Sequence, residues 1–131
     1  MTSHARGTFD VKLTPQTDDK SAGAVGRMSL DKQYHGDLEG TSKGEMLAVS
    51  TAVQGSAGYV AMEQVSGTLH GHSGTFALQH SGTMTRGTPQ LSITVVPDSG
   101  TGQLAGITGT MTINIVDGKH FYEFDYALDA R

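Results

Sequence analysis

The chain of 131 residues contains no cysteine, and this absence limits both its covalent chemistry and its metal chemistry. Disulfide bonds, thiol catalysis and cysteine-ligated zinc are excluded, so a bound metal would need His, Asp or Glu ligands. Positive charge is also scarce, because 9 Lys and Arg residues stand against 13 Asp and Glu residues, for a net charge of -4. The sequence therefore offers no polybasic surface, and we predict no nucleic-acid partner.

Long apolar runs are missing as well. Nowhere do about 18 apolar residues follow one another, which is the length that a membrane-spanning helix needs. Residues 1–7 contain no apolar segment of the kind found in a secretory signal. Because the lack of cysteine is also compatible with a reducing compartment, we predict a cytoplasmic protein without a membrane partner.

Neither a proline-rich linker nor a block of charge divides the chain, and its 3 prolines and 18 glycines are spread along its length. A chain of this size can bury one modest core, so we predict a single domain over residues 1–131. Within residues 95–110 the glycines separate strand-like segments and do not open a helix. This arrangement favours a β-barrel over a nucleotide-binding loop.

Apolar residues alternate with polar ones in five segments, which is the pattern of strands with one buried face. The alternating apolar positions are Phe9, Val11 and Leu13; Phe76 and Leu78; Leu91, Ile93 and Val95; Met111, Ile113 and Ile115; and Tyr122, Phe124, Tyr126 and Leu128. Polar residues lie between them, as in an antiparallel sheet with one face toward solvent. Residues 45–54 and 59–65 also place apolar residues near helical spacing, so one short helix is an alternative there.

The Asp-Gly dipeptide at 117–118 predicts a two-residue type I′ hairpin, because both residue types tolerate a positive φ. In that register Ile115 faces His120 and Ile113 faces Tyr122. A shift by one residue would mix the apolar and polar faces and lose the burial. We therefore expect His120 and Tyr122 on the buried face, where their polar atoms need partners or a cavity.

A second hairpin is predicted between residues 59–69 and 74–84, with residues 70–73 as its turn region. Any even number of turn residues gives the two strands one shared, mostly apolar face. That face carries Tyr59, Ala61, Glu63, Val65, Leu69, Phe76, Leu78 and His80. Glu63 and His80 then lie opposite or diagonal to each other, with Cβ atoms roughly 5 to 8 Å apart, within reach of a hydrogen bond or a bridging water.

Glu63 and His80 form the best polar pair in the sequence. A buried, ionised carboxylate is costly unless it is paired. Either His80 neutralises Glu63, or desolvation raises the pKa of Glu63 and makes it a proton donor. The pair is accordingly interpreted either as a structural contact that fixes the register or as a catalytic site.

Three other motifs are interpreted as structural. His70 and His72 have the spacing of same-face metal ligands, but the neighbouring glycines favour an exposed turn, and we predict no metal and no cofactor. The glycines between residues 100 and 109 lack the spacing of a dinucleotide-binding motif. Residues 97–100 fit a turn, and Ser99 lacks the strand-turn-helix setting of a nucleophile.

Several segments together resemble an uncharacterised bacterial family of unknown function, and the likeness covers nearly the whole chain. These segments are Gly58–Glu63, Gly74–His80, Val96–Gly106 and His120–Tyr122, with Gly36–Gly40 and Asp125–Leu128. Members of that family are similar in fold to the allene oxide cyclase barrel, which plant dirigent proteins share. The resemblance implies an all-β, eight-stranded antiparallel barrel of calycin type and makes strands of the two ambiguous segments. No catalytic residue is carried over, because no cyclase active-site motif maps onto this chain.

An eight-stranded barrel has an interior that is either filled by side chains or holds one small ligand. Our preferred hypothesis is a barrel that binds a hydrophobic small molecule in a cavity with a few polar groups. The candidate cavity residues are Tyr59, Glu63, His80, His120, Tyr122 and Tyr126, with Glu39, in an expected turn, held in reserve. One alternative is an isomerase or cyclase in which Glu63, assisted by His80, moves a proton or stabilises positive charge. The other is a solid-cored barrel that serves assembly or contact with a partner protein. We also expect a homo-oligomer, either a dimer or a trimer.

Overall fold

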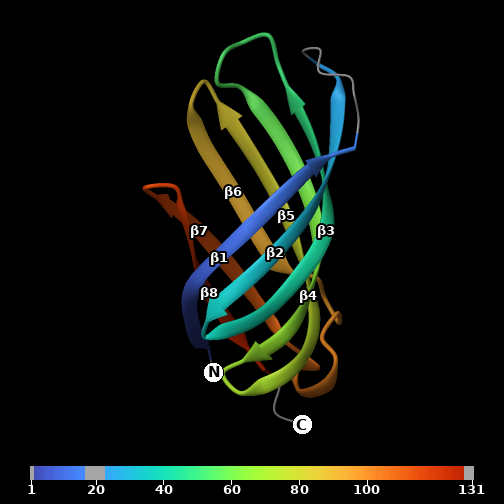
Figure 1. Ribbon diagram of the computed structural model, residues 1–131, viewed down its shortest axis with the longest axis vertical. Helices are drawn as coiled ribbons and strands as arrows, with labels where there is room; N and C mark the ends of the chain where they lie inside the picture. The colour runs from blue at the N-terminus through green and yellow to red at the C-terminus, as the bar shows by residue number, and fades with distance from the viewer. Residues whose placement is uncertain (1, 17–22, 129–131) are drawn as a thin grey trace.

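The computed structural model describes residues 2–16 and 23–128, and they form a closed antiparallel barrel. The elements in chain order are β1 (Ser3–Pro15), β2 (Val25–Gly36), β3 (Leu38–Ser50), β4 (Ala57–Leu69), β5 (His72–Thr85), β6 (Thr88–Val95), the 3-10 helix η1 (Gly102–Leu104), β7 (Thr108–Val116) and β8 (Lys119–Ala127). Each strand pairs with its neighbours in the sequence, and β1 closes the ring with β8 (Figure 1). The predicted eight-stranded antiparallel barrel is confirmed. Within the described ranges, no helix is long and apolar enough to cross a membrane.

Two-residue turns set the register of both predicted hairpins. The Asp117-Gly118 turn has φ values of 51° and 78°, as a type I′ turn requires, and Ile115 pairs with His120 as expected. The His70-Gly71 turn has φ values of 45° and 83°. The β4–β5 turn is therefore shorter than the four-residue region predicted, but its residue count is even and the shared face of the two strands is confirmed.

The two segments with a helical alternative are strands. Residues 45–50 belong to β3 and residues 59–65 to β4, as the family resemblance implied. The small inward-facing residues of β3, Ser42 and Gly44, conceal the period of two in that strand. In the β6–β7 connection, Gly102 opens one turn of 3-10 helix, whereas the sequence indicated no helix there. Leu104 of this turn is fully buried and covers one end of the barrel interior.

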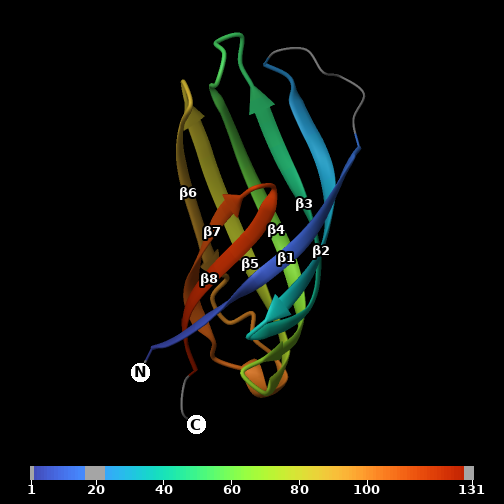
Figure 2. The same cartoon turned by 60° about the vertical axis from the view of Figure 1, so that its left-hand side comes forward.

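The end of the barrel that holds η1 and the β4–β5 turn, here called the closed end, is filled by side chains. Its fully buried apolar residues include Leu38, Leu69, Phe76, Leu78, Leu104 and Phe124. The ring of Phe124 stacks on Phe76 with a centroid distance of 5.7 Å and on Tyr126 at 5.4 Å. Both views show η1 beside the β4–β5 turn at this end (Figures 1 and 2).

The opposite end, which holds the β3–β4 and β5–β6 loops, is here called the open end. Four inward-facing apolar side chains remain partly exposed there: Leu13 (46%), Met84 (39%), Leu91 (43%) and Ile115 (64%). They share their faces with buried residues of the same strands, because alternate residues of a strand point to one side. The alternating pattern therefore predicted the correct face for Leu13, Leu91 and Ile115. The prediction that this face is buried along the whole length of each strand is wrong.

The length of the β7–β8 hairpin explains this exposure. Figure 2 shows that this hairpin ends well below the β3–β4 and β5–β6 hairpins. In the described strands, the register joins β6 to β7 only through the pairs Ile93 with Met111 and Thr94 with Thr110. The first residues of β6, near the open end, and the tip of β7 consequently lack a neighbouring strand that would cover their inward side chains.

Candidate functional site

Five polar side chains meet inside the barrel, between the open and closed ends. They are Lys32 and Tyr34 of β2, Ser42 of β3, Glu63 of β4 and His80 of β5, here called the Glu63 cluster. The exposed fractions of these residues are between 0% and 8%. The cluster forms a polar layer across an otherwise apolar interior.

Strand register brings the Glu63 cluster together. Glu63 lies opposite Gly44 of β3, and His80 of β5 is diagonal to it, as one of the two predicted arrangements has it. A Cβ atom at Gly44 would lie 1.9 Å from a carbonyl oxygen of β4, so only glycine allows the two strands to approach this closely. The close approach holds Ser42, the preceding inward residue of β3, beside the Glu63 carboxylate.

The Glu63 carboxylate is fully enclosed and accepts bonds at both of its oxygens. Oε1 accepts a hydrogen bond from the Tyr34 hydroxyl at 2.6 Å. Oε2 accepts one from the Ser42 hydroxyl at 3.1 Å and lies 3.0 Å from Lys32 Nζ. Lys32 Nζ also lies 3.5 Å from the Tyr34 hydroxyl and 4.8 Å from the centroid of the Phe9 ring, which is cation–π geometry.

Glu63 is an anion at neutral pH in this setting. Burial by itself raises the pKa of Glu63, but the neighbouring His80, the charge of Lys32 and the Tyr34 hydrogen bond outweigh burial and lower the pKa to about 2. Burial and the adjacent carboxylate raise the pKa of Tyr34, which keeps its hydroxyl a donor. Lys32 thus supplies the neutralising charge that the sequence interpretation assigned to His80, and the pKa of Glu63 is lowered and not raised.

His80 is the member of the cluster whose hydrogen bonding is incomplete, although its contact with Glu63 lowers the pKa of that carboxyl group. Its Nε2 lies 3.5 Å from Glu63 Oε1, which is close enough for electrostatic attraction. Among the residues that the structure describes, however, this buried atom has no hydrogen-bond partner. Buried polar atoms are nearly always hydrogen-bonded. Nε2 of His80 is therefore a position at which one further polar group can be satisfied.

Two other predicted residues lie on the same inner face. Tyr59 packs its ring over Gly82, where a Cβ atom would lie 2.5 Å from the ring, and burial raises the pKa of Tyr59. The half-buried His120 ring has its centroid 5.0 Å from that of the Phe9 ring. The Phe9 centroid in turn lies 5.6 Å from that of the Tyr34 ring. Aromatic contacts thus connect His120 to the Glu63 cluster without a direct polar bond.

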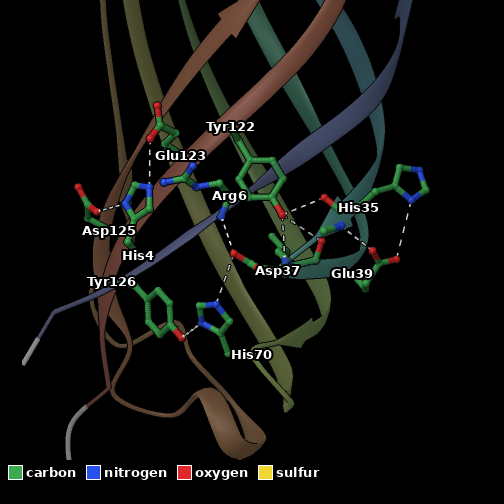
Figure 3. Close-up of polar contacts among 12 residues, drawn as sticks. His4, Arg6, His35, Asp37, Glu39, His70, Tyr122, Glu123, Asp125 and Tyr126 are labelled. Carbon is green, nitrogen blue, oxygen red and sulfur yellow. Dashed lines mark hydrogen bonds and ion pairs between the residues drawn. The ribbon is translucent and has the colours of Figure 1, made fainter.

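The predicted residues Tyr122 and Tyr126 direct their hydroxyl groups to the turns of the closed end (Figure 3). The Tyr122 hydroxyl accepts the Leu38 N–H at 2.9 Å and lies 3.0 Å from the carbonyl oxygen of His35. Burial raises the pKa of Tyr122 to about 12. The Tyr126 hydroxyl lies 2.5 Å from Nδ1 of His70. Both hydroxyls are therefore engaged in holding the ends of strands.

Asp37 and Glu39 lie near these turns (Figure 3). Asp37 Oδ2 accepts the backbone N–H of Arg6 at 3.0 Å, which lowers the pKa of Asp37, and lies 3.5 Å from Nε2 of His70. Glu39, the reserve candidate, accepts the Gly36 N–H at 2.6 Å and belongs to the start of β3. These contacts join the β2–β3 and β4–β5 turns to β1. No group of three or more His, Asp or Glu residues suited to a metal ion occurs in residues 2–16 and 23–128.

Sequence reasoning missed Lys32, Tyr34 and Ser42. A signal was present for two of them, because Met28, Leu30, Lys32 and Tyr34 occupy alternate positions and so share one face of a strand. Lysine in such a pattern is usually exposed, which conceals its role. Ser42 gave no comparable signal, since its neighbours on that face are glycines.

A hollow of about 570 Å³ lies over β1, β7 and β8. Its lining combines outward-facing residues such as Arg6 and Phe121 with the inward-facing Ile115, and it includes no residue of the Glu63 cluster. We therefore locate the candidate site inside the barrel, where the buried polar groups converge.

Comparison with known proteins agrees with this architecture. The family described as "Protein of unknown function (DUF3224)" matches residues 5–126. A crystal structure of a protein of unknown function from the same family, from Shewanella oneidensis MR-1, is 50% identical, with a TM-score of 0.94 and coverage of 100% of both chains. No curated protein matches the sequence. The chain belongs to the DUF3224 family.

Proposed function

We propose that this protein binds a small, mainly apolar molecule in the open end of its barrel. The observation that carries the proposal is the contrast within the interior, where apolar side chains fill the closed end but stay partly exposed at the open end. Inward-facing Leu13, Met84 and Leu91 are 39–46% exposed, although they point toward the barrel axis. A concave apolar surface with a few polar groups at its base is typical of small-molecule sites.

The chemistry of the Glu63 cluster supports binding more than catalysis. Proton transfer needs a group whose pKa lies near the working pH, and the pKa of Glu63 is about 2. Its charge is also balanced by Lys32 at 3.0 Å, which leaves little of its field for a developing positive charge in a substrate. The isomerase or cyclase hypothesis accordingly has no observation in its favour beyond the position of the pair.

An uncharged naphthylamine dye that fluoresces in apolar surroundings tests the proposal directly. The chain has no tryptophan whose emission would interfere with that of the dye. Leu91→Asp places a charge on the inner face of the open end, and Val60→Asp is its matched control on the outer face. The two side chains are similarly exposed, at 43% and 51%, so neither change removes a buried contact.

We expect the wild-type protein and the V60D variant to bind the dye equally and the L91D variant to bind it at least tenfold more weakly, because burying an unpaired charge is costly (on the order of tenfold per 1.4 kcal/mol). Loss of binding in V60D but not in L91D would instead locate the dye on the outer face. Absence of dye binding to the wild type would overturn the proposal.

A further inference from the structure

We infer that the ligand carries an uncharged oxygen, a hydroxyl or a carbonyl, which forms a hydrogen bond with Nε2 of His80, and that carboxylates and amines are rejected. The inference rests on the proposed function and names the chemical class of molecule that the open end takes. It follows from which polar groups of the Glu63 cluster already have hydrogen-bond or ion-pair partners and which group lacks a hydrogen bond.

The carboxylate of Glu63 is fully enclosed by its own partners, so a donor group of a ligand has no access to it. Oε2 serves both Ser42 and Lys32, at 3.1 and 3.0 Å. Oε1 accepts the Tyr34 hydroxyl at 2.6 Å, and the ring of His80 lies against it at 3.5 Å. An ammonium group would therefore enter the interior without a carboxylate to pair with, which is strongly unfavourable.

Lys32 offers no free charge for an anion either. Its ammonium group is paired with Glu63 and packs over the ring of Phe9 at 4.8 Å. The side chains of Lys32 and Glu63 are 6% and 0% exposed, and their charges cancel. A carboxylate or phosphate brought to this layer would leave a net negative charge in an enclosed region, which is strongly unfavourable.

His80 supplies the complementary group. Within residues 2–16 and 23–128, its Nε2 is the buried side-chain nitrogen or oxygen left without a hydrogen bond. A hydroxyl group both donates and accepts, so it satisfies Nε2 whether or not that nitrogen carries the proton, and a carbonyl satisfies it when the proton is there. Neither group changes the charge balance of the Glu63 cluster.

The geometry of the interior places such a group at the inner end of an apolar chain. His80, Gly82 and Met84 are successive inward-facing positions of β5, running from the Glu63 cluster to the open end. Leu91 of β6 pairs with Gly82, and the Tyr59 ring covers that glycine. An apolar chain that lies against the Tyr59 ring and Leu91, and not on Gly82 itself, would direct its polar head toward His80.

Displacement of the naphthylamine dye by four ligands of equal chain length tests the inference. The ligands are 1-octanol, 2-octanone, octanoate and octylammonium, compared at about pH 8, where the acid and the amine are charged. We expect the alcohol and the ketone to displace the dye at concentrations at least about tenfold lower than the acid and the amine require. His80→Leu should weaken the alcohol and the ketone about tenfold and leave dye affinity unchanged, and His80→Gln, which restores an amide N–H, should recover part of the loss.

Octanoate or octylammonium binding as tightly as octanol overturns the inference, as does an H80L variant with unchanged preference among the ligands. The proposed function would survive either result, because the dye would still bind at the open end. If the wild type binds neither the dye nor any of the four ligands, the proposed function itself fails. If H80L does not fold, the order of the four ligands in the wild type decides by itself.

Discussion

The two ends of the barrel are built from the same alternating strands, yet they differ in what covers their inward side chains. At the closed end, Leu104 of η1 lies over the interior and Phe124 is fully buried between Phe76 and Tyr126. At the open end, Leu91 and Ile115 have the same orientation but are 43% and 64% exposed. The comparison shows that strand alternation determines the direction of a side chain, whereas the lengths of neighbouring strands and connections determine its burial.

The tyrosines of the two ends also differ in the partners of their hydroxyl groups. Tyr122 and Tyr126 place their hydroxyl groups against the turns of the closed end, where partners in the backbone or in His70 satisfy them. Tyr34 instead donates to Glu63, so its hydroxyl belongs to the polar layer beneath the open end. One residue type therefore closes one end of the barrel and supports the polar layer under the other.

The largest effect is expected from truncation of the closed-end core. Phe124→Ala should lower the free energy of unfolding by about 4 kcal/mol, because it removes a fully buried ring and leaves a cavity. Leu91→Ala at the open end should cost less than about 1 kcal/mol, since much of that side chain is already exposed. Urea unfolding followed by circular dichroism measures both values. Equal losses would contradict the distinction between the two ends.

The Glu63 cluster should be nearly as sensitive as the closed-end core. Glu63→Leu leaves the buried Lys32 without its carboxylate and should cost about 3 kcal/mol or somewhat more, measured in the same way. The double variant K32M/E63L removes both charges and should regain most of that loss. A double variant as unstable as the single one would show that shape, and not charge pairing, dominates this layer.

Acid should remove a comparable amount of stability. The pKa of Glu63 is lowered from 4.5 to about 2 in the folded state, so its contribution is complete above about pH 5 and is lost as the pH falls toward 2. The corresponding free energy is on the order of 3 kcal/mol. Unfolding free energies measured between these pH values should fall more steeply for the wild type than for Glu63→Gln. Identical slopes would mean that Glu63 is not the carboxylate responsible.

A smaller effect is expected at the β2–β3 turn. Tyr122→Phe keeps the ring but leaves the buried Leu38 N–H without its 2.9 Å partner, at a cost of about 1–2 kcal/mol. Amide hydrogen exchange at Leu38 should accelerate accordingly. Tyr126→Phe is the matched control and should cost less than about 1 kcal/mol, because its partner His70 is half-exposed. An unchanged Leu38 amide in Y122F would contradict the assigned contact.

Local patterns allowed the hairpins and one polar pair to be predicted. The Asp117-Gly118 dipeptide determined the β7–β8 register, and one even-numbered turn was sufficient to bring Glu63 close to His80. Both inferences need only two adjacent strands. The prediction that one face of β4 and β5 is shared depends on the same two-residue period and is confirmed.

The rest of the site depends on strands that are distant in sequence. Lys32 and Ser42 reach Glu63 only because β2, β3 and β4 pair in a particular register, and nothing in the local sequence of β2 specifies that register. The inward glycines do not by themselves leave room for a cavity. At Gly44 that room is taken by the neighbouring strand, and at Gly82 by the ring of Tyr59. The cytoplasmic location, the oligomeric state and the likeness to allene oxide cyclase stay predictions.

The short ladder between β6 and β7 has a mechanical consequence. Two residue pairs join these strands, whereas β5 and β6 are joined from Leu78 to Thr85. A barrel with one short ladder can separate most easily between those two strands, while its longer ladders stay intact. Pro89, near the start of β6, offers no backbone N–H to a foreign strand at that position. The β6–β7 ladder is therefore the part of the described barrel wall held by the fewest residue pairs, and the proline interrupts the row of donors along the unpaired edge of β6.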